Sequence, residues 1–368
     1  STKVEKRQHF QHQLATARAK EGNLKVSKEI ERMQGTEKQR VSAQRIRRMN
    51  GSERSTKGLT KVVVPGDDGD DIELVEKLAM EEALLQAYET TLTQANKTPC
   101  MVSPLKERLG SCGTGDLADA LIHGDYTNLD GVDGATQEVL KYLQLKEGSN
   151  NILTPKALGV DECKVGWKKA KERTSSAMQM GTHFGHWKVG HTDDEIAGIH
   201  TGFANIPFLT GYSPKRWQFG INSLLTKEHG NFRVDRLRTI LLYEADYNFN
   251  SKILGKRMMY HAEKENILAP EQYGSRRNKT AIECALNKIL MFDLLRQTKR
   301  PAGICSCDLK ACYDRIVHSF ASMAMQRAGA PTAAIESMFT TIQKLKHTVR
   351  TCHGDSETSF GGEDWREL

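Results

Sequence analysis

The sequence predicts an α+β fold that follows a basic, mostly helical N-terminal region. Apolar residues recur at helical spacing over 278–299 and 332–346, and short apolar runs that suit strands lie at 303–308 and 349–352. This alternation of helices and strands favours the α+β class. The third observation is charge. Residues 1–60 contain 15 Lys and Arg against 6 Asp and Glu, a net charge of +9 that exceeds the +7 of the whole 368-residue chain.

The basic region, residues 1–60, reads as one or two helices with few apolar positions, followed by the cluster of Arg45, Arg47 and Arg48. A helix that is polar nearly all round cannot bury one face. Two interpretations stay open: a solvated extension, or a surface that contacts nucleic-acid phosphates. Contacts of the second kind would be independent of base sequence and sensitive to salt.

A small hairpin and a helix are predicted next. Residues 61–71 read as a strand and a turn, a return strand follows at 72–74, and 73–97 have the apolar spacing of a helix. The four aspartates of the turn lack the ligand spacing of an EF-hand loop. They therefore predict a solvated turn rather than a calcium site.

Three histidines, His183, His186 and His191, lie close together in an aromatic-rich run. Histidine is a zinc ligand, but the run contains no Cys or carboxylate to complete a site. We therefore prefer a loop with a tight turn at Gly185. The eight cysteines of the chain include no C-x-x-C pair, so free thiols are expected.

The segment 303–318 carries the most chemical information. Alternate residues of a strand face opposite sides. Asp308 would thus lie on one face, at the end of the strand, while Cys305 and Cys307 lie on the other, which can be buried. Tyr313 follows five residues later. The alternative is a buried strand whose aspartate only caps the following helix.

Three further blocks precede this segment and strengthen its interpretation. They are WQFGINSLLTKEHG at 217–230, RTILL at 238–242 with DYNFNSKILGKR at 246–257, and QYGSRRNKTAI at 272–282. With CDLKACYD at 307–314, they resemble the blocks of non-LTR (LINE-like) retrotransposon reverse transcriptases, in the same order. Thr239, Ser275 and Asn248 depart from the family's Pro, Phe and Lys at these places.

The resemblance implies a right-hand polymerase fold, of which residues 166–368 would form the fingers and part of the palm. Residues 61–165 would be a helical pre-polymerase region and 1–60 a basic helical arm. The segment 278–299 is expected to be an amphipathic helix that serves as core scaffolding. Further helices are expected at 313–327 and 332–346.

The resemblance also assigns roles to single residues. Such polymerases use two divalent ions, Mg²⁺ or Mn²⁺, which prefer oxygen ligands. Asp308 would bind both ions, helped by the backbone carbonyl of Leu309. Tyr313 would lie under the incoming sugar and exclude a 2′-hydroxyl. Lys227 and Arg238 would bind the triphosphate, where fixed positive charge offsets developing negative charge.

Two arginines, Arg276 and Arg277, precede the helix expected at 278–299. Two interpretations stay open for them: contact with template phosphates, or a structural place at the start of the helix. Asp314, next to Tyr313, is expected to anchor structure rather than to bind metal.

The implied function is RNA-directed DNA synthesis for a retroelement, with an RNA template, a DNA primer and deoxynucleoside triphosphates as partners. Residues 309–368 contain neither a Gln-Gly loop nor an aromatic-x-Asp-Asp motif, which supplies the other metal carboxylates. We therefore expect a truncated polymerase that is inactive alone. The alternative is a non-catalytic nucleic-acid-binding remnant. No apolar run approaches the ~18 residues of a membrane span, so we expect an intracellular protein, cytoplasmic or nuclear, without membrane partners.

Overall fold

In the computed structural model the chain forms two compact units, Ser1–Lys57 and Gly58–Leu368. Arg45, Arg47, Arg48 and Leu309 lie outside the described residues. The structure describes residues 9, 11, 13, 59–66, 69–145, 157–171, 182–303, 305–308 and 312–362.

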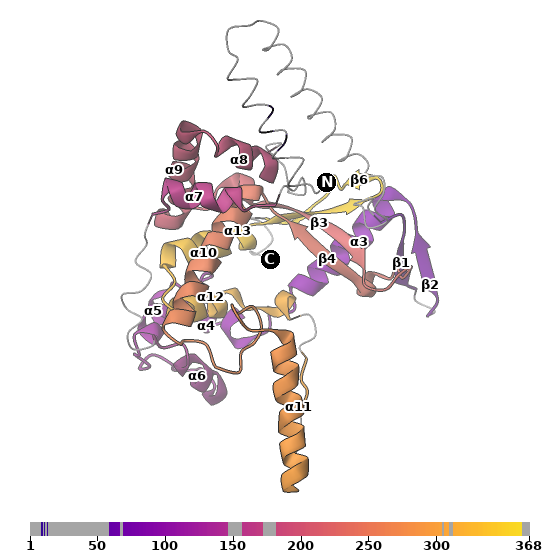
Figure 1. Cartoon of the computed structure of the whole chain (residues 1–368). Coiled ribbons are helices and arrows are strands. Elements are labelled where there is room, and N and C mark those ends of the chain that lie inside the picture. Colours follow the sequence, from indigo (N-terminus) through magenta and orange to yellow (C-terminus); the bar gives the residue numbers. More distant parts are fainter. Residues whose placement is uncertain are drawn as a thin grey trace, which may run out of the picture. The chain divides into compact units, whose positions relative to one another are not determined.

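A five-stranded sheet forms the centre of the second unit (Figure 1). Its strands are β3 (Phe219–Thr226), β4 (Leu237–Leu242), β5 (Lys346–Thr351), β6 (Gly354–Asp355) and β7 (Phe360–Gly361). They are ordered β4-β3-β5-β6, and β7 also pairs with β5. β3 runs antiparallel to β4, with Leu225 opposite Arg238, and parallel to β5, with Ile221 opposite Thr348. The strand expected at 349–352 is thus confirmed as part of β5.

One face of this sheet is covered by helix α3 (Lys77–Leu92), which crosses it in Figure 1. Met80 and Leu84 of α3 are at most 1% exposed and pack with side chains of three strands. Those strand residues are Leu224, Leu237 and Val349. The helix expected at 73–97 is confirmed over a shorter span, since Leu74 lies in a strand and α3 ends at Leu92.

The predicted hairpin is confirmed. β1 (Val62–Pro65) and β2 (Asp71–Leu74) pair antiparallel, with Val62 opposite Leu74. Val62 is fully buried in the same cluster as α3, which explains why this apolar run forms a strand. A single bridge from Val63 to Arg233 joins the hairpin to the turn between β3 and β4.

A group of helices packs around a second apolar cluster. The helices are α7 (Val160–Lys168), α8 (Phe184–Gly190), α9 (Asp194–Thr210), α10 (Ala245–Lys264) and α13 (Thr332–Gln343). At the centre, Trp167 of α7 stacks on Phe249 of α10, with ring centroids 4.2 Å apart. The loop expected around Gly185 is wrong, because these residues form α8.

A third cluster joins early and late parts of the sequence. Short helices η1 (Pro99–Met101), α4 (Leu105–Leu109), α5 (Asp116–Ile122) and α6 (Gly134–Lys141) surround Met323 of α12 (His318–Arg327). Met323 is fully buried. The helix expected at 313–327 is therefore right only from His318. Residues 313–315 form a 3-10 turn, η5, and Tyr313 is 88% exposed.

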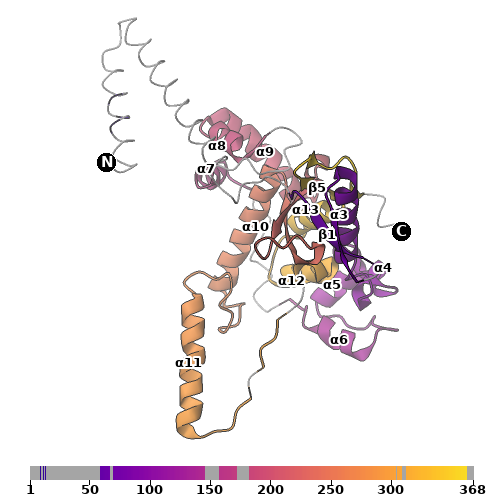
Figure 2. The same ribbon diagram turned by 90° about the vertical axis from the view of Figure 1, so that its right-hand side faces the viewer.

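The helix expected at 278–299 is confirmed as α11 (Ala281–Thr298), orange in Figure 2. It begins at a capping box, in which Thr280 and Glu283 satisfy each other's backbone N–H groups. Its expected role as core scaffolding is wrong, because no residue of α11 is buried and Ile282 is 80% exposed. Apolar spacing predicted the helix but could not supply a neighbour to cover it.

The strand expected at 303–308 is also wrong. Residues 305–308 are neither helix nor strand, and Cys305 and Cys307 are exposed rather than buried. A strand needs a neighbouring strand for its backbone N–H and C=O groups, and no described strand pairs with this segment.

In class, the described chain combines helices with small sheets, as expected. Among the helices that the structure describes, none is long and apolar enough to cross a membrane.

Candidate active site

Two of the predicted site residues, Lys227 and Arg238, lie on the β3–β4 hairpin. The backbone N–H of Lys227 donates to the carbonyl of Arg236 over 3.1 Å, which continues the β3–β4 register by one pair. Because side chains alternate along each strand, Lys227, Arg236 and Arg238 share one face. Leu224 and Leu237 point to the other face, against α3. The three cations are therefore on the face that α3 leaves open.

Apolar and basic side chains mix on this open face. Leu225 is 44% exposed and Ile240 is 42% exposed. Lys346 and Arg350 of β5 belong to the same face, since they stand opposite Phe219 and Ser223.

Only some of these cations are free to meet a ligand. Arg350 donates to both carboxylate oxygens of Asp355 at 2.5 and 2.8 Å. Arg238 is exposed, and no ion pair joins it to another residue that the structure describes. Exposed guanidinium groups beside apolar side chains suit a ligand that carries phosphates and planar bases.

The segment that follows Asp308 lies beside α3. Partial burial raises the pKa of Asp314, and the nearby Lys227 ammonium acts in the opposite direction. Arg315 donates from Nε to Gln94 just beyond α3 at 2.7 Å. The structure therefore places η5, which contains Tyr313, beside α3.

Asp308 itself is exposed and lies in the irregular segment 305–308. Within the described part of the chain, no group of three or more His, Cys, Asp or Glu side chains is placed to hold a metal ion. Mg²⁺ needs near-octahedral oxygen coordination, which one exposed carboxylate does not provide. The residues present here therefore do not fit a two-metal centre.

Arg276 has a structural place. It donates to both oxygens of Glu263 at 2.9 and 2.8 Å and to the carbonyls of Ala269 and Gln272 at 2.8 and 3.3 Å. Its side chain is only 10% exposed. With its donors engaged in the connection between α10 and α11, Arg276 matches the interpretation of a residue that flanks a helix start. The neighbouring Arg277 is exposed.

The three predicted histidines do not gather into a zinc site. His183 caps α8, with its ring accepting from the N–H of Gly185 over 3.0 Å, and His186 accepts from the N–H of His183 over 3.1 Å. His191 instead lies 2.9 Å, ring nitrogen to ring nitrogen, from His200 of α9. Sequence reasoning missed His200 because it belongs to a different helix.

The His191–His200 pair belongs to the aromatic core. Nδ1 of His191 donates to the carbonyl of Trp187 over 2.7 Å, so its Nε2 accepts from Nδ1 of His200. Burial lowers the pKa of both rings, that of His200 to about 4, and the charge of His191 adds to the effect on His200. Both rings are therefore neutral near pH 7.

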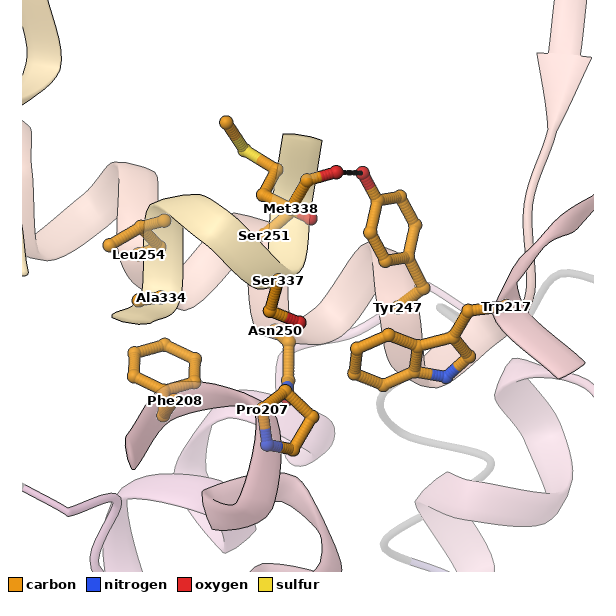
Figure 3. A pocket seen from close by; sticks show the side chains of 10 residues that line it. All are labelled: Pro207, Phe208, Trp217, Tyr247, Asn250, Ser251, Leu254, Ala334, Ser337 and Met338. Carbon is orange, nitrogen blue, oxygen red and sulfur yellow. Dashed lines mark hydrogen bonds between the residues drawn. The ribbon is translucent and has the colours of Figure 1, made fainter. Parts of the chain in front are cut away.

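A pocket between α9, α10 and α13 is too small to be a substrate site (Figure 3). Pro207, Trp217 and Tyr247 are among its lining residues, and the Tyr247 hydroxyl donates to the carbonyl of Met338 over 3.4 Å. Its volume of about 20 Å³ suits one or two water molecules. It is a packing gap in the helical core.

Comparison of the sequence with protein-family models gives no match, and comparison with curated proteins gives none either. The resemblance to reverse transcriptases therefore depends on the four blocks described above.

Proposed function

We propose that this chain supplies the fingers and the first palm segment of an RNA-directed DNA polymerase of a non-LTR retroelement. One observation supports the proposal most. Lys227 and Arg238 share the open face of the β3–β4 hairpin, and the chain after Asp308 packs beside α3, the helix that covers the other face of that hairpin. In this proposal the first segment makes the triphosphate contacts and the second makes the sugar contact.

The proposed roles follow from charge and geometry. Lys227 and Arg238 bind the triphosphate, because paired cations on a rigid hairpin are held in place before the negative charge arrives. The exposed apolar residues beside them, Leu225 and Ile240, pack on the template. In a longer chain that supplies the other carboxylates, Asp308 would contribute one metal-binding carboxylate and Tyr313 would select the deoxyribose.

Synthesis needs carboxylates that residues 309–368 do not supply in an aromatic-x-Asp-Asp motif. We therefore expect purified 1–368 to show no primer extension on an RNA template with Mg²⁺ or Mn²⁺. Extension that disappears in Asp308→Ala would contradict this expectation.

The second candidate function is nucleic-acid binding without catalysis. The mixed basic and apolar face of the sheet favours it, since that face can bind a strand whether or not Asp308 is near a metal. In that case Asp308→Ala and Tyr313→Ala leave RNA affinity unchanged, and neither residue has a role.

The experiment that separates the two functions begins with the reading frame beyond codon 368. For the polymerase, we expect a Gln-Gly loop and an aromatic-x-Asp-Asp motif within roughly 100 codons, the size of the missing part of a domain. The longer chain should then extend a DNA primer on RNA, and Asp308→Ala should abolish extension. A frame without either motif would leave only the binding function.

A further inference from the structure

We propose that Cys305 and Cys307 form a reversible redox site, a dithiol that low-molecular-weight disulfides such as oxidised glutathione convert to an intramolecular disulfide. The two Sγ atoms lie 3.3 Å apart, and both side chains are exposed. Two thiols in contact at the surface can react as a pair. Once one of them has formed a mixed disulfide, the other is close enough to displace the glutathione.

Exposure separates this pair from the core thiols. Cys163 is fully buried beside Trp167, and burial raises the pKa of its thiol, which suppresses the reactive thiolate. No such barrier of burial protects Cys305 and Cys307. Cys312 is also exposed and follows closely in sequence, so it is the competing partner that a test must separate.

The chemistry balances without a metal. The thiolate of one cysteine attacks a sulfur of oxidised glutathione, which forms a mixed disulfide and releases one glutathione thiolate. The thiolate of the other cysteine then attacks the protein sulfur of that mixed disulfide and releases the second glutathione. The protein loses two protons and two electrons, and the glutathione disulfide gains them.

The disulfide is incompatible with a strand at 303–308. Residues two apart in a strand point to the same face, so their Cβ atoms are separated by about 6.6 Å, twice the rise of ~3.3 Å per residue. A disulfide needs Cβ atoms ~3.5–4.5 Å apart. Oxidation of Cys305 and Cys307 would therefore hold the segment in an irregular conformation and keep Asp308 from the strand end where a polymerase presents its aspartate. This consequence rests on the proposed function, whereas the dithiol chemistry does not.

The test uses the whole chain and reads mass rather than activity. Trypsin cleaves after Lys299, since the Arg300–Pro301 bond resists it, and after Lys310, so one peptide contains both Cys305 and Cys307 and no other cysteine. After treatment with oxidised glutathione, we expect this peptide to lose the mass of two hydrogens. Cys352, an exposed thiol on a separate peptide, should instead gain glutathione and keep it, because it has no paired thiol to displace the second glutathione.

Matched variants decide between outcomes. Cys312→Ser should leave the disulfide intact, whereas Cys305→Ser and Cys307→Ser should each convert the remaining thiol into a glutathione adduct. Adducts on both cysteines of the native chain, or loss of the disulfide in Cys312→Ser, would overturn the proposal. If the longer chain extends primers, oxidised glutathione should suppress extension and dithiothreitol restore it. Equal suppression in Cys307→Ser would show that the oxidant acts elsewhere. If the peptide loses two hydrogens but the longer chain does not extend primers, the proposed polymerase function is rejected and the dithiol proposal stands.

Discussion

Arg216 and Asp246 form a two-pronged ion pair that ties the start of α10 to the 3-10 turn before β3. One of its hydrogen bonds measures 2.8 Å, and the Asp246 side chain is only 4% exposed. The pair therefore connects the helical group to the sheet that carries Lys227 and Arg238.

Removing Asp246 should destabilise the chain strongly. In Asp246→Ala the Arg216 guanidinium is left partly buried without its counter-ion, which costs about 3–5 kcal/mol. Urea unfolding followed by circular dichroism measures the loss. The matched control is Asp194→Ala, whose carboxylate pairs with Lys164 but is 88% exposed. That surface pair should contribute under ~1 kcal/mol. Equal losses in both variants would contradict this view of Asp246.

Stability should fall as the pH is lowered from 6.5 towards 4. The folded-state pKa of His200 is about 4, against an unperturbed value of 6.5. Between these values the unfolded chain binds more protons, so the free energy of unfolding rises with pH, by up to roughly 3 kcal/mol for one such group. The contribution of His200 to stability is fully present above pH 6.5. Burial also lowers the pKa of His347 to about 4, so this residue contributes to the pH dependence in the same direction.

The measurement is the urea midpoint at pH 7.5 and pH 5. His200→Gln should reduce the difference between the two midpoints, while His123→Gln, at a histidine whose side chain is 65% exposed, should not. A difference that is unchanged in His200→Gln would place the pH dependence elsewhere.

Apolar residues of α11 and α13 should respond differently to truncation. Ile335 of α13 is fully buried, so Ile335→Ala leaves a cavity that costs about 2–5 kcal/mol. Ile289 of α11 is 56% exposed, and Ile289→Ala should change the free energy of unfolding by less than ~0.5 kcal/mol. Comparable losses in the two variants, measured by urea unfolding, would mean that α11 is covered in solution.

Nucleic-acid affinity should depend on Arg238. For an RNA template annealed to a DNA primer, Arg238→Ala should weaken binding and lower the slope of log affinity against log salt by about 1, the loss of one phosphate contact. Fluorescence anisotropy over a salt series measures both quantities. Lys168→Ala, at an exposed cation of α7, is the control of equal charge change. The same slope in both variants would show that Arg238 does not contact the nucleic acid.

Local patterns by themselves determined several elements of this protein. The alternating apolar run and the turn at 61–74 gave the β1–β2 hairpin, and Thr280 with Glu283 marked the start of α11. These features depend on residues close in sequence, whose spacing and turn chemistry are visible in the chain.

Tertiary structure alone decided the remaining features. Alternation suggested a strand at 303–308, but a strand is stable only beside another, and the described sheet offers no partner there. Periodicity gave α11 an apolar face without showing what covers it. The meeting of His191 with His200 and the engagement of Arg276 by Glu263 depend on how helices and turns pack. Burial, pairing and backbone hydrogen bonding between distant segments are properties of the packed chain, which local spacing does not encode.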